Sequence, residues 1–152
     1  MSIYKEVFIY VSKPKTHVVA MKVLFVCSGN AYRSPVAEAL LKKFRPDIDV
    51  DSAGTHAVIP ISDEAKKYLT RENAVGHLKE KPESLYEKRL DEYDVIVAMK
   101  QEHKNLVLSQ CPECESKIIV WNIDDPYFMP RRYAEKTFRQ IREKVLELAN
   151  SL

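Results

Sequence analysis

The sequence predicts an α/β protein in which helices form two outer layers around a central, four-stranded, mostly parallel β-sheet. Short apolar segments alternate with amphipathic segments from residue 21 onward, as they do in βαβ units. The run Lys22–Val26 is continuously apolar after its lysine, which is typical of a central strand covered on both faces. The chain has 152 residues, the size of one ordinary domain. We therefore expect a three-layer α/β/α domain over residues 21–152.

The expected elements follow one another in a regular order. After Lys22–Val26, a Ser-Pro pair and apolar residues at helical spacing predict a helix over Ser34–Phe44, with Ser34 as a favourable N-cap. Asp47–Ser52 predicts a short strand, and Ser62 begins a second amphipathic helix. Residues 72–90 show no clear pattern. The remaining elements are a strand over Tyr93–Met99, a helix over Gln101–Leu108, a strand over Lys117–Trp121 and a long helix that begins at Pro130.

The first twenty residues lie outside this scheme. Met21 stands directly before the first core strand, so it is a candidate for the true start of the protein. The segment Ile3–Val11 contains β-branched and aromatic residues, which are common in strands. Residues 1–20 are therefore expected to be an N-terminal extension, either an extra edge strand, a flexible segment or a misassigned start. Of these, we favour a dispensable extension.

Composition excludes several classes of function. The formal net charge is +2, from 24 basic and 22 acidic residues, and no basic stripe with interleaved aromatic residues indicates nucleic-acid binding. No apolar run approaches the roughly 20 residues of a membrane-spanning helix, and the N-terminus lacks the apolar stretch of a signal peptide. Three cysteines fit a reducing compartment better than a disulfide framework. We expect a cytoplasmic protein of unknown oligomeric state that binds neither nucleic acid nor membranes.

Glycine is scarce, with three residues in the whole chain. Gly29 lies in a loop after the first expected strand, Gly54 follows the second, and Gly76 precedes His77. A chain that otherwise avoids glycine is expected to keep it where the backbone needs a positive φ or a close approach. The alternative is that these are three ordinary loop glycines.

The strongest chemical signal is the segment Leu-Phe-Val-Cys-Ser-Gly-Asn-Ala-Tyr-Arg-Ser-Pro at residues 24–35. It places Cys27 at the end of a buried strand and Arg33 where a helix begins, and we call residues 27–33 the cysteine loop. The free N–H groups and positive dipole end of that helix favour a thiolate. Successive backbone N–H groups could surround a phosphate while Arg33 grips two of its oxygens. The expected phosphate-binding residues are Ser28, Gly29, Asn30, Ala31, Tyr32, Arg33 and Ser34.

A cysteine that attacks phosphorus needs a general acid for the leaving oxygen, and the same group can later activate water. We choose Asp125, which precedes Pro126 directly after the fourth expected strand, at the carboxyl edge of the sheet where ligands bind in open α/β folds. Its neighbour Asp124 competes for this role, and spacing alone does not separate the two. A structural turn role for Asp-Pro is the alternative. Ser34 is expected to donate a hydrogen bond to the thiolate, to cap the helix, or both.

Residues 23–39, Val-Leu-Phe-Val-Cys-Ser-Gly-Asn-Ala-Tyr-Arg-Ser-Pro-Val-Ala-Glu-Ala, closely resemble the signature of low-molecular-weight protein tyrosine phosphatases. Asp51–Thr55, Gly76-His77 and Asp125–Tyr127 occur in the family's order, so the resemblance covers about residues 22–150. It implies the flavodoxin-like fold of that family, a phosphatase domain over residues 21–152, and no metal or cofactor. The resemblance assigns Cys27 as nucleophile, Arg33 as phosphate clamp, Asp125 as acid and then base, and Ser34 as donor to the thiolate. It also implies a supporting polar network of Asn30, Ser52 and His77.

The same resemblance predicts the substrate class. It implies hydrolysis of phosphotyrosine-type monoesters, on proteins or small aryl phosphates, through a phosphocysteine intermediate. Tyr32, Tyr127 and Phe128 are candidates to stack on a phenol ring. Many family members carry a second cysteine at the position of Tyr32, and the tyrosine-specific members often carry larger aliphatic residues at Ser28 and Ala31. Related enzymes that act on phosphoarginine usually have threonine at the position of Ala31. Because Ala31 matches neither group, a protein arginine phosphatase is an alternative.

Two further alternatives remain. The loop also resembles that of thioredoxin-coupled arsenate reductases, which need two more cysteines, and Cys111 and Cys114 supply a pair. That Cys-Pro-Glu-Cys segment could instead form a local disulfide or half of an intermolecular zinc site. A phosphate-binding module without turnover is the other alternative, against which the presence of Cys27, Arg33 and Asp125 argues.

Overall fold

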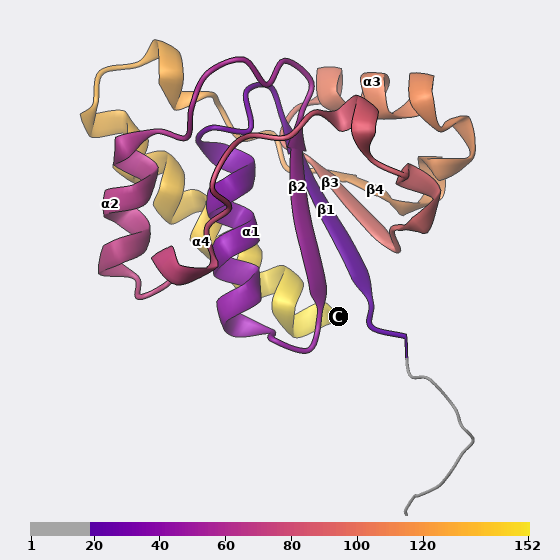
Figure 1. Ribbon diagram of the computed structural model, residues 1–152, viewed down its shortest axis with the longest axis horizontal. Coiled ribbons are helices and arrows are strands. Elements are labelled where there is room, and N and C mark those ends of the chain that lie inside the picture. Colours follow the sequence, from indigo (N-terminus) through magenta and orange to yellow (C-terminus); the bar gives the residue numbers. More distant parts are fainter. Residues whose placement is uncertain (1–18) are drawn as a thin grey trace, which may run out of the picture.

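A computed structural model describes residues 19–152 and contains a parallel β-sheet at its centre (Figure 1). Within these residues the sheet has four strands in the order β2-β1-β3-β4, and every neighbouring pair is parallel. The predicted four-stranded sheet is confirmed, with no antiparallel strand in it. The strands are β1 (Lys22–Cys27), β2 (Asp49–Gly54), β3 (Val95–Ala98) and β4 (Ile118–Val120). The expectation for residues 1–20 falls, except for Val19 and Ala20, outside the described residues.

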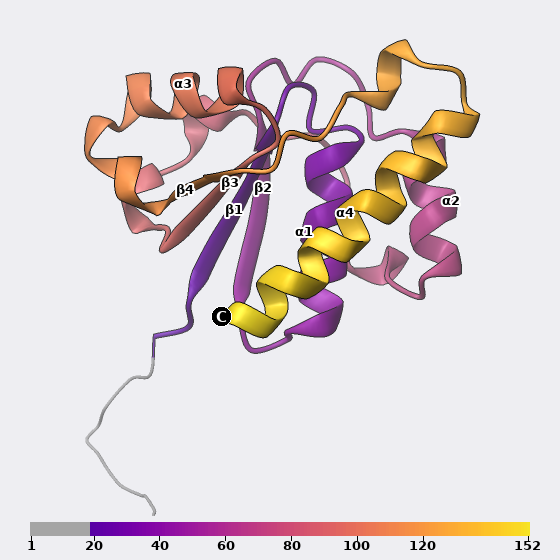
Figure 2. The ribbon, with the colours of Figure 1, turned by 180° about the vertical axis from the view of Figure 1, so that it is seen from behind.

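Helices cover both faces of the sheet, which confirms the three-layer α/β/α class (Figures 1 and 2). Three helices lie on one face: α1 (Arg33–Phe44), α2 (Asp63–Arg71) and α4 (Arg132–Ser151). On the other face lies α3 (Gln101–Gln110), followed by the 3₁₀ helix η4 (Pro112–Lys117). The order of strands and helices is the one expected from hydrophobic periodicity, and the ends differ by at most two residues.

Strand β1 lies at the centre of the sheet because it can be buried on both faces. Val23, Phe25 and Cys27 point into the cluster of apolar side chains against α1 and α4, whereas Leu24 and Val26 point into the cluster on the α3 face. Successive side chains of a strand point to opposite faces, so a continuously apolar run fits only a strand covered twice. The predicted central position of this strand is confirmed, and it brings Cys27 to the carboxyl edge of the sheet.

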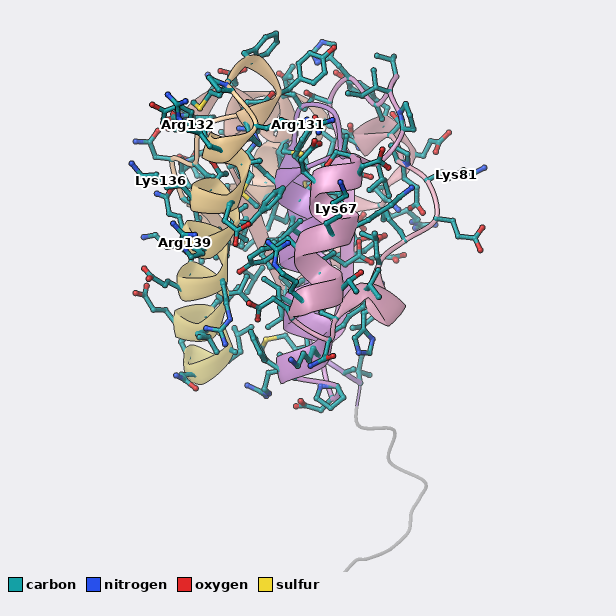
Figure 3. All side chains as sticks on the ribbon, turned by 90° about the vertical axis from the view of Figure 1, so that its left-hand side faces the viewer. Lys67, Lys81, Arg131, Arg132, Lys136 and Arg139 are labelled. Carbon is teal, nitrogen blue, oxygen red and sulfur yellow. A yellow bond between two sulfur atoms is a disulfide. The ribbon has the colours of Figure 1, made fainter. Side chains whose placement is uncertain are left out.

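Helix α4 presents two different faces. Apolar residues such as Phe138, Ile141 and Val145 are buried against the rest of the domain. The outward face is charged, with cations in its first half, and Figure 3 shows Arg132, Lys136 and Arg139 projecting from it. Such a division is what the 3.6-residue periodicity of the C-terminal segment predicts.

Residues 72–90 lacked a sequence pattern because they form short 3₁₀ helices, η1 (Val75–His77) and η2 (Leu85–Glu87), joined by irregular chain. An element of three residues is too short to show a hydrophobic period. A third, η3 (Leu90–Glu92), follows directly. The segment reaches the cysteine loop, because the Glu83 N–H donates to Asn30 Oδ1 at 2.8 Å.

The expectation that glycines occupy the backbone positions with positive φ is wrong for this chain. None of them has a positive φ, and the left-handed positions are instead Asn30, Asn73 and Asn122. Gly54 does serve a close approach, since a Cβ atom there would lie 2.7 Å from the Ser28 carbonyl oxygen. Added Cβ atoms at Gly29 and Gly76 would meet nothing closer than 3.7 Å, so these two are ordinary loop glycines.

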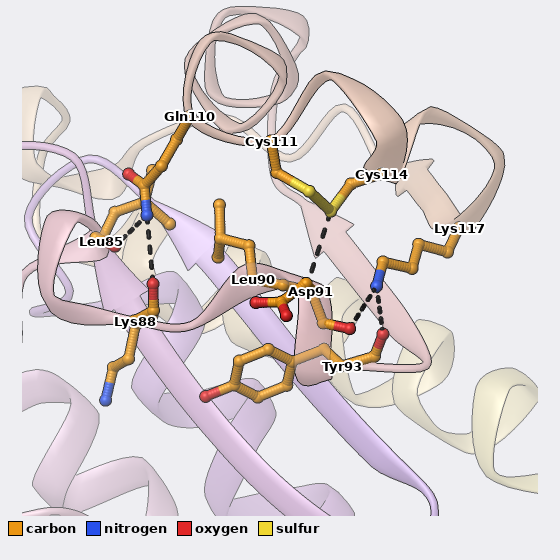
Figure 4. The surroundings of a disulfide bond; sticks show 9 residues. All are labelled: Leu85, Lys88, Leu90, Asp91, Tyr93, Gln110, Cys111, Cys114 and Lys117. Atoms are coloured by element: carbon orange, nitrogen blue, oxygen red, sulfur yellow. Dashed lines mark hydrogen bonds between the residues drawn. A yellow bond between two sulfur atoms is a disulfide. The ribbon is translucent and has the colours of Figure 1, made fainter.

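Cys111 and Cys114 form a disulfide within the α3 face of the domain (Figure 4). The local disulfide is therefore the alternative that the structure favours, which corrects the expectation that the cysteines stay reduced. Both residues are buried with Leu90, whose carbonyl oxygen lies 3.7 Å from Cys114 Sγ. Cys27 belongs to the apolar cluster on the opposite face and is a free cysteine. This separation does not favour a resolving role for the pair in an arsenate reductase.

The disulfide is expected to contribute to stability. It closes a short loop with a sequence separation of 3, for which the chain-entropy relation gives about 2 kcal/mol. Reduction should therefore lower the thermal midpoint by about 4–8 °C, measured by circular dichroism with and without a phosphine reductant. The matched control is the Cys111→Ser/Cys114→Ser variant, whose midpoint should not respond to the reductant. An unchanged midpoint of the native sequence on verified reduction would contradict the prediction.

Candidate active site

The cysteine loop forms the floor of a cavity at the carboxyl edge of the sheet. The cavity has a volume of about 320 Å³. It lies where β1 ends and α1 begins, so the free N–H groups of the α1 N-terminus belong to its wall. Its lining residues are Cys27, Ser28, Gly29, Ala31, Tyr32, Arg33, His56, Val58, Ile59, Asp125, Tyr127 and Phe128.

Cys27 is 2% exposed, and two donors lie close to its sulfur. Its Sγ lies 2.9 Å from Ser34 Oγ and accepts from the Asn30 N–H at 3.3 Å. Helix α1 begins at Arg33, with Tyr32 at the N-cap position and no side-chain cap, so Ser34 is not the N-cap that the Ser-Pro pattern predicted. The Ser34 hydroxyl contacts the sulfur instead, since it lies in the first turn of α1. Both donors and the helix end favour a sulfur anion at this position.

Asn30 holds the loop in shape through three side-chain contacts. Its φ of 53° is left-handed, a conformation that Asn tolerates better than most residues. Its Nδ2 donates to Ser34 Oγ at 2.8 Å and to Ser52 Oγ at 2.9 Å, and its Oδ1 accepts from the Glu83 N–H. Asn30, Ser34 and Ser52 are thus brought together as expected. A loop fixed in this way keeps its backbone N–H groups oriented for an anion before it binds.

His77 does not belong to this network, which corrects the expected supporting set. Its side chain is exposed on η1, where a 3₁₀ turn carries it to the surface. The network continues instead through Glu38, because Ser52 Oγ donates to Glu38 Oε1 at 2.5 Å. Lys42 Nζ lies 2.6 Å from Glu38 and Lys79 Nζ 3.7 Å from it, so the buried carboxylate is balanced by two cations. Sequence reasoning missed Glu38, although a charged residue on the buried side of α1, one turn after Ser34, was a usable signal.

Arg33 is 2% exposed and spans the cavity between two chain segments. Its Nη1 donates to the Ile123 carbonyl oxygen at 2.8 Å, and its Nη2 lies 3.4 Å from Asp125 Oδ2 and 3.5 Å from Ser28 Oγ. Its Nε is buried and has no hydrogen-bond partner among residues 19–152. A buried donor without a partner is costly, so an anion in the cavity would relieve this cost.

The two neighbouring aspartates have different surroundings. Asp125 lines the cavity beside Arg33, and its Oδ1 accepts from the Tyr127 N–H at 3.0 Å. Asp124 is exposed and pairs with Lys100, whose Nζ lies 2.6 Å away, and this ammonium lowers the pKa of the Asp124 carboxyl. Only Asp125 is therefore within the cavity that holds Cys27.

Aromatic and aliphatic side chains form the upper walls of the cavity. The rings of Tyr32 and Tyr127 meet edge to face with centroids 6.2 Å apart, and Phe128 packs against Tyr127 at 5.0 Å. Phe128 is 82% exposed, so it lies at the rim. Val58 and Ile59 also line the cavity, and sequence reasoning missed them because they lie in an irregular loop after β2. The cavity thus combines a polar floor with apolar walls.

Comparison with known proteins places this geometry in a family. The model of the family described as low molecular weight phosphotyrosine protein phosphatase matches residues 22–152. The chain belongs to this family. The phosphatase is therefore a hydrolase, and phosphoproteins or phosphate esters are its class of substrate. It is 30% identical over 139 residues to the low molecular weight protein-tyrosine-phosphatase Wzb of Salmonella typhi, covering 86% of this chain and 93% of that protein.

Two solved structures share the fold of the phosphatase. Vibrio vulnificus Wzb in complex with benzylphosphonate is 28% identical, with a TM-score of 0.77 and coverage of 87% of this chain and 99% of that chain. The YwlE arginine phosphatase from Geobacillus stearothermophilus is 26% identical, with a TM-score of 0.76 and coverage of 86% and 92%. In residues 19–152 of the phosphatase, no helix is long and apolar enough to cross a membrane.

Proposed function

We propose that this phosphatase hydrolyses phosphotyrosine-type monoesters on proteins through a phosphocysteine intermediate. The Cys27 thiolate attacks phosphorus, the bond from phosphorus to the phenolic oxygen breaks, and Asp125 gives its proton to that oxygen. The Asp125 carboxylate then takes a proton from water, which attacks phosphorus and releases inorganic phosphate and the thiolate. Support comes from the shared cavity of the two groups, with donors around the sulfur on one side and the carboxyl on the other.

Arg33 and the cysteine loop would hold the phosphoryl group during both steps. The Arg33 guanidinium is anchored because its Nη1 donates to the Ile123 carbonyl oxygen. Its Nε, and its Nη2 near Asp125, are left for phosphoryl oxygens. The backbone N–H groups of the loop, Ser28 to Ser34, would surround the remaining oxygens. These interactions strengthen as negative charge accumulates in the transition state. No step in this scheme requires a metal ion or a cofactor, and a cytoplasmic location is part of the proposal.

The observation that carries the substrate assignment is the apolar wall formed by Tyr32, Tyr127 and Phe128 above the polar floor. An aromatic leaving group can stack against such rings, whereas the short aliphatic side chain of phosphoserine could not reach them. The Wzb structure from Vibrio vulnificus, which holds benzylphosphonate, offers a related protein with an aryl ligand.

A protein arginine phosphatase is the second candidate, favoured by the likeness to YwlE. Two features of the cavity weigh against it. Ala31 has no hydroxyl to meet a guanidinium, and Asp125 is the one carboxylate among the described residues that line the cavity. Since Asp125 lies beside Arg33, it has little capacity left to bind a second cation.

Phosphate release from matched peptides carrying phosphotyrosine, phosphoserine or phosphoarginine tests the assignment. With a chelator present, we expect kcat/KM for phosphotyrosine to exceed the other two by at least about tenfold, because one or two apolar contacts are worth about 1–3 kcal/mol. The control is Phe128→Ala, which should reduce the preference for phosphotyrosine without abolishing turnover. A preference for phosphoarginine would overturn the assignment of phosphotyrosine as substrate, but it would not contradict the phosphocysteine mechanism.

A further inference from the structure

A buried histidine outside the cavity contacts the residue that follows Cys27. His103 lies in the first turn of α3 and is 1% exposed. Its Nε2 is 2.9 Å from Ser28 Oγ, although the two residues are 75 positions apart in the chain. The mechanism above makes no use of His103. A buried imidazole in contact with the cysteine loop is therefore a group whose role is open.

The protonation state of His103 follows from its surroundings. The Lys100 N–H donates to Nδ1 at 3.0 Å, so Nδ1 must be the acceptor nitrogen and the proton lies on Nε2. Burial lowers the pKa of His103 to about 4, assisted by the nearby positive charges of Arg33 and Lys100. The ring is thus neutral at neutral pH. It has one N–H left, on Nε2, and this N–H donates to Ser28 Oγ.

The Ser28 hydroxyl consequently has a defined direction. Its oxygen accepts from His103 Nε2, and Arg33 Nη2 lies 3.5 Å away on the cavity side. With a donor already in contact, the hydroxyl proton must point elsewhere, and the structure gives it no acceptor within residues 19–152. Ser28 lines the cavity together with Cys27. The direction open to its proton is the space where a phosphoryl group would lie.

We propose that the Ser28 hydroxyl donates a hydrogen bond to a phosphoryl oxygen of the substrate, and that His103 is a positioning residue that orients this hydroxyl. The inference rests on the proposed function and adds a side-chain donor to the backbone N–H groups of the loop. The donor is aligned before the substrate binds, so its interaction grows with the charge on the phosphoryl oxygens. The imidazole itself transfers no proton.

Four variants test the proposal with an aryl phosphate as substrate. Ser28→Ala should lower kcat/KM by about tenfold to a hundredfold, as expected for a hydrogen bond to a charged group. His103→Leu should lower it by about threefold to thirtyfold, whereas His103→Gln, whose Nε2 can still donate, should stay within about threefold of the native enzyme. The Ser28→Ala/His103→Leu double variant should match Ser28→Ala within about twofold, because the effect of His103 passes through Ser28.

The double-variant cycle separates positioning from a structural role. If His103→Leu lowers kcat/KM as strongly in the Ser28→Ala background as in the native one, the proposal is overturned. Loss of activity in His103→Gln equal to that in His103→Leu would also overturn it, because glutamine keeps a donor for the Ser28 hydroxyl and leucine does not. Thermal midpoints of all variants report any loss of folding, and ¹⁵N spectra must find the His103 proton on Nε2.

A binding measurement keeps this test independent of turnover. Titration of the Cys27→Ser variant with inorganic phosphate should give weaker affinity when Ser28→Ala or His103→Leu is added, and unchanged affinity with His103→Gln. The four proteins compared are Cys27→Ser alone and Cys27→Ser with each of the three added substitutions. Equal phosphate affinities of all four would refute the inference even if the enzyme hydrolyses phosphotyrosine. An inactive native enzyme that shows the expected order of affinities would refute the proposed function instead.

Discussion

Replacing Cys27 by serine is expected to lower kcat for aryl phosphate hydrolysis by about 10⁴-fold or more, because it removes the attacking atom. A serine hydroxyl is not ionised at neutral pH, and the donors that favour an anion at this position are too weak to ionise it. Loss of a nucleophile elsewhere has effects of roughly this size. The measurement is steady-state release of inorganic phosphate in the presence of a chelator.

Two controls make this result specific to Cys27. The Cys111→Ser/Cys114→Ser variant should keep kcat within about twofold, since the disulfide lies on the other face of the sheet. Phosphate should still bind to Cys27→Ser, which shows that the loop is folded. Substantial hydrolysis by Cys27→Ser would contradict the phosphocysteine scheme, and equal losses in both variants would point to unfolding rather than chemistry.

Replacing Asp125 by asparagine is expected to lower kcat by about 10²–10⁴-fold for an unactivated phenyl phosphate, the usual contribution of a general acid. Asparagine keeps a side-chain oxygen that can accept from the Tyr127 N–H, but it has no acidic proton to give to the leaving oxygen. The loss should shrink for an activated ester, whose phenoxide leaves without a proton. A series of aryl phosphates with different phenol pKa values therefore measures the role directly.

The neighbouring aspartate is the matched control. Asp124→Asn changes the same functional group one position away, but Asp124 is exposed and paired with Lys100, outside the cavity. We expect kcat of this variant to stay within about threefold of the native value. Should Asp124→Asn show the larger loss, or should Asp125→Asn slow all esters equally, the assignment of the general acid would be wrong.

Features that depend on short stretches of chain could be predicted from the sequence. The cysteine loop is an example, because a strand, a seven-residue loop and a helix start bring Cys27 and Arg33 together without help from the rest of the chain. The continuous apolar run Lys22–Val26 likewise predicted a central β1, and parallel strands place all their carboxyl ends at one edge. Asp125 could be chosen for this reason, although it lies far along the chain from Cys27.

Contacts between distant segments could not be predicted in the same way. His77 was expected beneath the loop and lies at the surface, whereas Glu38 and His103 contact loop residues or their supports through tertiary packing. The left-handed backbone positions fell on asparagines rather than on the scarce glycines. Nothing in a linear pattern distinguishes Asp124 from Asp125, because only the direction of the chain after β4 sends one side chain to Lys100 and the other to Arg33.

By itself, the sequence determined the family, the three-layer fold and the reactive loop, since these follow from periodicity and from residues within one short segment. The tertiary structure decided which carboxylate shares the cavity with Cys27, which groups support the loop and which side chains form the cavity walls. The physical reason is that hydrogen bonds and apolar contacts act over a few ångströms. Residues separated by tens of positions make such contacts only after the strands and helices have packed. Local sequence patterns therefore do not predict these contacts.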